Sequence, residues 1–311
     1  MCPMVNGIYE SPKKNCLKYI RYDSPHSMCD FGMDFCQKTY TEIHGLDVER
    51  GEVNFDVNEI QNGSIVYVKW DYIDDFSKQL PELDYKMNTT NSKFILLTGR
   101  GDAHISQPMV NYLLNFKSIA KWFRCNPVSF DPRIDFFPIG FGEVERQYGC
   151  PELIDSLYNE DSIEKINKIY VPIFANTNSK RSIWMKEFIE KYKDICVVEK
   201  PDIIPDDPHS GLSGRLPPKK YMETLSKYKY CLCLNGDGQD VHRNYECLLT
   251  STVPVMPDTP IRQYYNQLGI SNEPMENFTG TVEFNVEDKQ KVLYNYWYDK
   301  LKKAQKEIRG Y

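Results

Sequence analysis

The 311-residue sequence lacks any long apolar run. No stretch approaches the roughly 18 consecutive apolar residues that suggest a membrane-spanning helix. The first residues, MCPMVNGIYESPKKNC, also lack the apolar core of a secretory signal peptide. From these two absences we expect a soluble, cytoplasmic protein with no membrane span.

Positive charge is also in short supply. The chain has 38 lysines and arginines against 44 acidic residues, for a net charge of -6, which argues against a nucleic-acid partner. No GxxxxGK[ST] segment occurs, so a P-loop phosphoryl-transfer enzyme is excluded. The 10 cysteines form no CxxC pair, and we therefore expect reduced thiols and no zinc site. Three of them, Cys231, Cys233 and Cys247, fall in predicted core elements, where a thiol acts as a small apolar group.

What is present is the composition of a globular protein, with 41% hydrophobic and 26% charged residues. The length favours two domains. Short apolar runs alternate with helix-like segments, a pattern that predicts parallel α/β sheets. We expect an N-terminal domain over residues 1–165 and a C-terminal domain over 166–285. The tail, 286–311, carries an apolar stripe at helical spacing: Leu293, Trp297, Leu301, Ala304 and Ile308.

The segment from 221 to 256 is the most informative part of the chain. A short apolar strand at 230–234 runs into a glycine turn, a helix start for which Asp240 is the expected N-cap, and a second strand at 253–256. Glycines let the backbone approach a phosphate closely, and the first turn of a helix offers free N–H groups to an anion. Arg243 adds a bidentate cation, and Glu246, one turn further, can accept hydrogen bonds from sugar hydroxyls. An ordinary βα turn with an exposed Arg–Glu pair would have the same spacing.

This segment resembles the donor-binding signature of exostosin-like glycosyltransferases. The matching residues are the strand 231–234, the turn Gly236–Gly238, Asp240, Arg243, Glu246 and the strand 253–255. Where the family usually has Pro-x-Gly before the turn, this chain has Leu234-Asn-Gly. Further matches to the small members of the family, such as the soluble enzymes encoded by large algal viruses, are Phe94–Asp102, Trp122–Asn126 and Pro138–Gly140.

The resemblance implies the GT-B fold, in which two Rossmann-like domains face each other across a cleft and a C-terminal helix crosses back to the first. It also implies transfer of a sugar from a nucleotide-sugar co-substrate, a UDP-sugar such as UDP-xylose, to a hydroxyl of a glycan acceptor. The expected reaction needs no metal or further cofactor and inverts the anomeric centre with a carboxylate base. Two alternatives stay open: an enzyme similar to fucosyltransferases that uses GDP-fucose, and a non-catalytic α/β protein that binds a nucleotide or glycan.

Candidate site residues follow from these patterns. The base should lie at the carboxyl end of a strand of the first domain, and the loop after strand 93–98 offers Asp102 as first choice and His104 as second. In the second domain, Arg181 follows a strand and an N-T-N turn, where a cation can reach the diphosphate; Lys180 competes for this role. The glycine turn and the helix after it supply the other candidates for donor binding: Asn235, Gly236, Gly238, Asp240, His242, Arg243 and Glu246.

Overall fold

The computed structural model describes residues 4–5, 8–9, 18–22, 24–33, 57–99, 105–142, 149–159, 164–174, 177–200 and 216–311. The chain divides into two compact units. The N-terminal unit comprises Leu17–Ile139 and Leu293–Tyr311, and the C-terminal unit comprises Gly140–Val292 and Met1–Cys16. Within the described ranges, no helix has both the length and the apolar character needed to cross a membrane.

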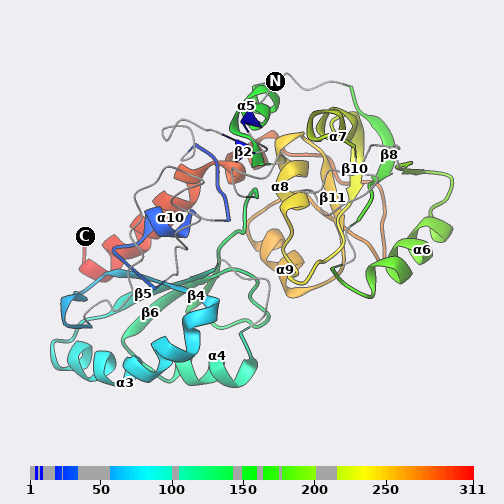
Figure 1. Ribbon diagram of the computed structural model, residues 1–311. Coiled ribbons are helices and arrows are strands. Elements are labelled where there is room, and N and C mark those ends of the chain that lie inside the picture. Colours follow the sequence, from blue (N-terminus) through cyan, green and yellow to red (C-terminus); the bar gives the residue numbers. More distant parts are fainter. Residues whose placement is uncertain are drawn as a thin grey trace. The chain divides into compact units, whose positions relative to one another are not determined.

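The N-terminal unit is built on a five-stranded parallel sheet whose strands follow one another in chain order. Its strands are β3 (Phe31–Met33), β4 (Ile65–Lys69), β5 (Phe94–Gly99), β6 (Ile119–Arg124) and β7 (Ile134–Phe136). The crossover helices α3 (Ile73–Thr89) and α4 (Gln107–Leu114) lie along one face of this sheet, with α10 (Tyr294–Arg309) on the other (Figure 1). A short 3-10 helix, η1 (Val57–Glu59), packs against α3, and η2 (Trp70–Tyr72) leads into it.

Alternation along the strands explains how both faces of this sheet are buried. Val66 and Val68 of β4 pack with Leu80 and Leu83 of α3 in one apolar core. The opposite face is covered by α1 (Pro25–Met28) and α10, where Trp297 contacts the rings of Phe136 and Phe137 edge-on. The expected return of the C-terminal helix to the first unit is therefore confirmed.

The C-terminal unit holds a second five-stranded parallel sheet, in the order β12-β11-β10-β8-β9. Its strands are β8 (Ile166–Val171), β9 (Cys196–Val198), β10 (Tyr228–Leu232), β11 (Val253–Met256) and β12 (Glu273–Pro274). Its helices are α5 (Pro151–Tyr158), α6 (Arg181–Lys191), α7 (Pro218–Leu225), α8 (His242–Leu249) and α9 (Pro260–Gln267), followed by the 3-10 helix η4 (Val286–Val292). The expected α/β class is confirmed in both units. A separate antiparallel pair joins β1 (Met4–Val5) to β2 (Ile8–Tyr9).

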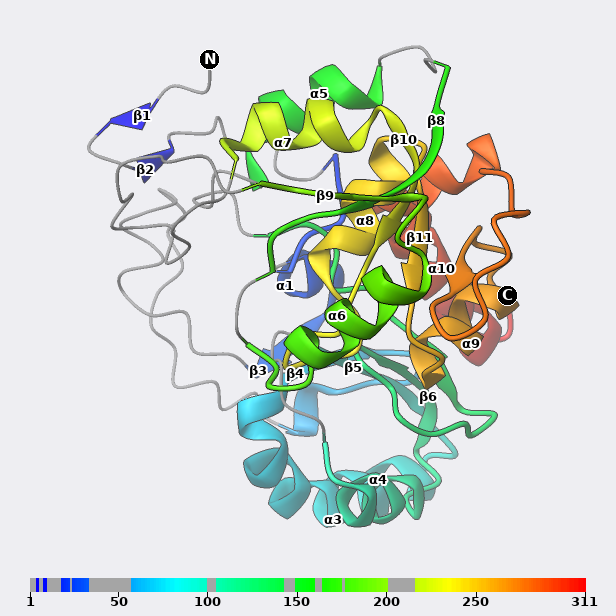
Figure 2. The ribbon, with the colours of Figure 1, turned by 90° about the vertical axis from the view of Figure 1, so that its right-hand side faces the viewer.

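Helices cover both faces of the C-terminal sheet (Figures 1 and 2). Along β10 and its extension, Tyr230, Leu232 and Leu234 pack with Phe188 of α6 in one core. The side chains between them, those of Cys231 and Cys233, point to the opposite face, toward α8. The division between the units falls at Ile139–Gly140 and not at the expected residue 165, because α5 packs on α8 of the C-terminal unit.

Candidate functional site

Strand order locates a ligand site in the C-terminal unit. After β8 the chain forms β9 on one side of it, and then returns to place β10 on the other side. The carboxyl ends of the parallel neighbours β8 and β10 therefore diverge at a switch point, which is where open α/β sheets bind ligands. The described strands of the N-terminal sheet run in simple sequential order and contain no such point. The predicted donor-binding turn, which follows β10, lies at this switch point.

Arg243 spans the two loops that leave the switch point. It lies in the first turn of α8, and its Nε donates to Tyr221 Oη at 3.1 Å. Its Nη2 donates to the carbonyl of Ile173, just after β8, at 3.3 Å. The guanidinium carbon is 4.5 Å from the centroid of the Phe174 ring, a cation–π contact. These contacts fix the guanidinium plane, while Nη1 has no hydrogen-bond partner among the described residues. The sequence prediction of a cation at the helix start is confirmed in position; its diphosphate contact stays a prediction.

Glu246 lies one turn further along α8 and is 7% exposed. Its Oε2 accepts a hydrogen bond from Tyr221 Oη at 2.7 Å, so that one phenol joins the carboxylate to the guanidinium of Arg243. Burial, and then the charge of Glu246, raise the pKa of Tyr221 well above its usual value, so the phenol keeps its proton. No described residue donates to Glu246 Oε1. Glu246 is thus buried and Arg243 partly buried, both are held in place by Tyr221, and the alternative of an exposed surface pair is wrong.

Arg181 makes contacts within the protein that the sequence did not predict. From the start of α6 its guanidinium donates to the carbonyls of Asn235 at 2.6 Å and Leu234 at 3.1 Å. It also donates to Thr177 Oγ1 at 2.8 Å. These bonds tie the loop after β8 to the turn after β10. They also account for a cation at a helix N-terminus, where the helix dipole disfavours it. A direct contact of Arg181 with a diphosphate stays a prediction.

The glycine turn packs closely against this arginine. A Cβ at Gly236 would lie 3.1 Å from Arg181 Nη2 and 3.4 Å from Thr177 Oγ1. The Gly236 carbonyl also accepts a bond from Asn178 Nδ2 at 2.9 Å. A side chain at Gly236 would therefore press against Arg181, a constraint of the protein's own packing, whereas the sequence suggested only the approach of a phosphate. Gly238 is buried in the same turn.

Asp240 is not the N-cap of α8, and this prediction was wrong. The N-cap is Val241, which has no side chain able to cap, and Asp240 is 2% exposed. Its carboxylate accepts hydrogen bonds from Tyr245 Oη at 2.5 Å, Tyr265 Oη at 3.1 Å and Asn244 Nδ2 at 3.0 Å. Asp240 therefore anchors the end of the turn in the core, because three donors compensate its buried charge.

The remaining predicted residues divide into two groups. His242, the first residue of α8, has its Nδ1 2.7 Å from the carbonyl oxygen of Gly140, and a contact with phosphate or base stays a prediction. Asp102 and His104 lie outside the described residues, between β5, which ends at Gly99, and Ile105. Their roles as base stay predictions too.

Three buried polar atoms at the same edge of the C-terminal sheet have no hydrogen-bond partner among the described residues. They are Asn235 Oδ1 and Gln239 Oε1, after β10, and Thr259 Oγ1, after β11. Thr259 is the N-cap residue of α9 but makes no side-chain cap bond. Leaving such atoms unpaired costs free energy, and a ligand that donates hydrogen bonds to these oxygens would offset that cost.

Sequence reasoning missed Tyr221 and Phe174. Tyr221 lies on the buried side of α7 with Met222 and Leu225, and this amphipathic spacing predicts burial but does not identify a partner. Phe174 continues an apolar run that predicts a strand over 168–174, but β8 ends at Val171, and the Phe174 ring lies beside both Arg181 and Arg243.

No protein-family model matches this chain, and no curated protein matches it. Among solved structures, it is similar to one described as trehalose-6-phosphate from E. coli bound with UDP-2-fluoro glucose, with 10% identity, a TM-score of 0.40, and coverage of 80% of this chain and 74% of the other. The apo structure of OtsA is 10% identical, with a TM-score of 0.41 and coverage of 78% and 72%. An alpha-glucosyltransferase in complex with UDP-glucose and DNA containing an abasic site is 13% identical, with a TM-score of 0.31 and coverage of 79% and 74%. At such low identities and TM-scores, these likenesses establish neither family nor activity.

Proposed function

We propose that this protein is a glycosyltransferase of the GT-B type that binds a nucleotide-diphosphate sugar in its C-terminal unit and transfers the sugar to a glycan hydroxyl. The observation that carries the proposal is the Arg243–Tyr221–Glu246 arrangement at the switch point between β8 and β10. It combines an oriented cation at a helix start with an oriented carboxylate one turn away. A diphosphate joined to a sugar or ribose presents the matching chemistry: negative charge next to hydroxyl donors.

Arg243 is assigned to the diphosphate. When the bond between the anomeric carbon and the diphosphate breaks, negative charge builds up on the leaving oxygen. A guanidinium already held by Tyr221 and by the Ile173 carbonyl stabilises that charge without having to reorganise. The positive end of the helix dipole at the start of α8 adds to the positive potential.

Glu246 is assigned to donor hydroxyls. Since Tyr221 occupies Oε2, Oε1 is the atom that accepts from a ribose or sugar hydroxyl. The unpaired oxygens of Asn235, Gln239 and Thr259 are acceptors for further hydroxyl or base N–H groups of the same ligand. A nucleotide-sugar is rich in such donors, whereas inorganic phosphate is not, and this favours the larger ligand.

The finer assignments rest on the resemblance to exostosin-like enzymes. It favours a UDP-sugar, with UDP-xylose as one candidate, and an inverting reaction that needs no metal. In that reaction Asp102, with His104 as the second candidate, takes the proton of the acceptor hydroxyl while the acceptor oxygen bonds to the anomeric carbon. The carbon–oxygen bond to the diphosphate breaks at the same time, and its electron pair leaves with the nucleoside diphosphate.

The first experiment measures melting temperature with UDP, GDP, UMP and UDP-sugars, each with and without EDTA. A ligand at 100 times its dissociation constant adds about 2.7 kcal/mol to the free energy of unfolding. We expect a shift with UDP that EDTA does not change and that Arg243→Ala abolishes. The matched control is Lys219→Ala, which removes one positive charge from an exposed side chain of α7 and should keep the shift.

The outcomes separate the alternatives. A shift of the melting temperature with GDP alone favours the hypothesis of a fucosyltransferase-like enzyme. A shift with UDP that EDTA removes contradicts metal independence. Release of UDP from a UDP-sugar by the wild-type protein distinguishes an enzyme from a binding protein. If none of the nucleotides shifts the melting temperature at millimolar concentration, the donor-site assignment is wrong.

A further inference from the structure

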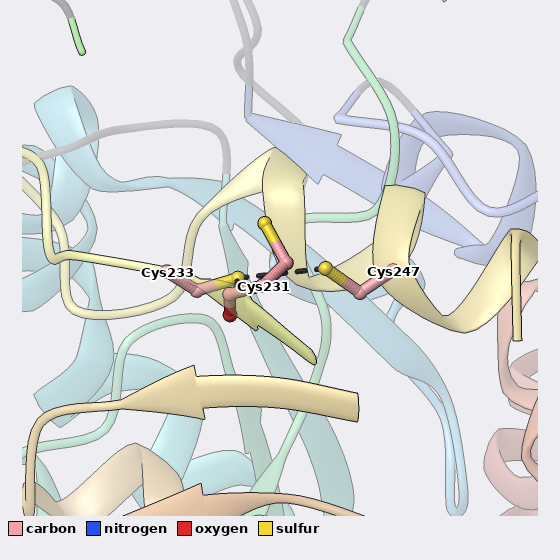
Figure 3. A group of neighbouring side chains, drawn as sticks. All are labelled: Cys231, Cys233 and Cys247. Carbon is pink, nitrogen blue, oxygen red and sulfur yellow. Dashed lines mark hydrogen bonds between the residues drawn. The ribbon is translucent and has the colours of Figure 1, made fainter. Parts of the chain in front are cut away.

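Three cysteines converge beneath the helix that carries Arg243. Cys231 belongs to β10, Cys233 follows it, and Cys247 lies on α8. Since Cys231 and Cys233 are two residues apart in extended chain, their side chains leave the same face of the sheet, and Cys247 faces them from α8 (Figure 3). All three are between 0% and 1% exposed.

The sulfur atoms are close enough to share one ion. All three Sγ atoms lie within 4.8 Å of one another, and those of Cys233 and Cys247 are 3.5 Å apart. Sulfur–metal bonds of about 2.3 Å place thiolates bound to one metal at similar separations. Within the described residues, no histidine nitrogen or carboxylate oxygen joins the group. The ligand set among the described residues is therefore three soft sulfur atoms, without a harder nitrogen or oxygen ligand.

Apolar packing alone does not require this arrangement. Core thiols act as small apolar groups, and sequence position alone predicts no more than that for these three. Other buried positions on the same sheet carry branched aliphatic side chains, such as Leu232, Val253 and Val255. On the face toward α8, this part of β10 instead presents two sulfurs to a third.

We propose that Cys231, Cys233 and Cys247 form a binding site for one monovalent copper ion. Soft thiolate ligands select monovalent copper, whereas structural zinc takes four ligands and this group offers three. Binding replaces the S–H protons by three copper–sulfur bonds and releases the protons to solvent. The copper enters and stays as Cu(I), so no electron is transferred.

The surroundings help to balance charge. The guanidinium of Arg243 is near enough to Cys231 and Cys233 to interact with them electrostatically, and its positive charge offsets part of the negative charge of a copper–thiolate group. Arg243 also lies one helical turn before Cys247 on α8. The copper site would thus lie directly below the proposed donor site, although neither proposal depends on the other.

The test uses the full chain, reduced and handled under argon. Cu(I) is supplied by expression in copper-supplemented medium and, separately, by long incubation of the purified protein with Cu(I) in ascorbate. Bound copper is measured after a bicinchoninate competitor has removed loosely held ion. We expect one copper per chain, with X-ray absorption showing three sulfur neighbours and no nitrogen or oxygen neighbour.

Two single substitutions provide the comparison. Cys247→Ser should lose the copper to the competitor, while Cys125→Ser, which changes a buried free thiol of the other unit, should keep it. Circular dichroism and the urea midpoint of each apo variant check that both fold. The absorption spectrum of the wild-type protein tests the proposal even if Cys247→Ser fails to fold.

Several results would overturn the assignment. They are the absence of copper after both loading routes, copper retained by Cys247→Ser, nitrogen or oxygen among the neighbours, or binding of Zn(II) in preference to Cu(I). Nucleotide shifts are recorded with the same samples. Binding of copper without binding of any nucleotide would contradict the proposed glycosyltransferase and leave the copper site supported. Binding of a nucleotide without binding of copper would contradict the copper site and leave the proposed glycosyltransferase supported.

Discussion

Tyr221 Oη donates a hydrogen bond to Glu246 Oε2 at 2.7 Å, and Tyr221 Oη also accepts one from Arg243 Nε at 3.1 Å. A single buried hydroxyl thus orders the two ionised side chains that the donor-site proposal needs. Neither is paired directly to the other in this arrangement, so each keeps an atom for a ligand. The relationship links α7 to α8 across the end of β10.

Tyr221→Phe tests this linkage. Removing the hydroxyl leaves Glu246 Oε2 buried without its donor, which should lower the free energy of unfolding by about 1–3 kcal/mol. Nucleotide affinity should fall as well, since Arg243 loses one of the bonds that orient it. Urea denaturation and nucleotide titration measure the two effects.

Tyr228→Phe is the control for this prediction. The Tyr228 ring stacks on Tyr170, no described residue bonds its hydroxyl, and we expect the free energy of unfolding to change by no more than about 0.5 kcal/mol. Equal losses in the two variants would contradict the role of Tyr221.

Asp240→Ala should be among the most destabilising changes in the C-terminal unit. It leaves three buried donors, on Tyr245, Tyr265 and Asn244, without their acceptor. We expect a loss of about 3 kcal/mol or more in the free energy of unfolding, measured by urea denaturation. Asp237→Ala, which alters an exposed carboxylate of the same turn, is the control and should have little effect. A loss of stability in Asp240→Ala no larger than that in Asp237→Ala would contradict the role of Asp240 as a buried anchor.

Gly236 and Arg181 should be energetically coupled. Gly236→Ala places a methyl group against the Arg181 guanidinium, and such overpacking costs about 1–3 kcal/mol. Arg181→Ala removes the obstacle together with the bonds to Leu234 and Asn235. In the double variant the alanine at 236 should therefore add less to the loss, with a coupling of about 0.5–3 kcal/mol in a double-mutant cycle by urea denaturation. Strict additivity would show that the glycine is needed for another reason.

Stability should fall at alkaline pH. Burial raises the pKa of Tyr221, Tyr245 and Tyr265 well above the usual 10.0. Above pH 10 these tyrosines lose their protons in the unfolded chain but keep them in the folded one, so the unfolded state binds fewer protons and gains in relative stability. Their contribution is fully present below pH 10 and is lost above it, at about 1.4 kcal/mol per pH unit for each tyrosine.

Urea denaturation at a series of pH values from neutral to strongly alkaline measures this slope. Tyr221→Phe should show a shallower slope by one tyrosine's share, because one of the shifted groups is gone. Tyr228→Phe serves again as the comparison. Parallel slopes for wild type and Tyr221→Phe would mean that Tyr221 ionises equally easily in the folded state.

Local patterns were sufficient for most of the secondary structure. Strands β4, β5, β6, β10 and β11 and helices α4, α6 and α9 lie where apolar runs, proline and glycine predict them, within a few residues. Helix α3 is the clearest difference: the residue pattern predicts a short helix over 71–80, whereas α3 continues through Pro81 to Thr89. Pro81 lies on the exposed side, and the buried stripe of Leu80, Leu83 and Met87 keeps the helix in place despite it.

The alternation of strands and helices, the turn after β10 and the spacing of Arg243 and Glu246 by one helical turn can be predicted from local sequence, because these features depend on neighbours within a few residues. Long-range packing is what brings β8 beside β10, buries Asp240, bonds Arg181 to the turn and lets Tyr221 join Glu246 to Arg243. Ile173 and Arg243 are 70 residues apart in the chain, and Tyr221 and Glu246 are 25 apart. A side chain's partner at such separations is set by how strands and helices pack, which no local pattern of residues contains.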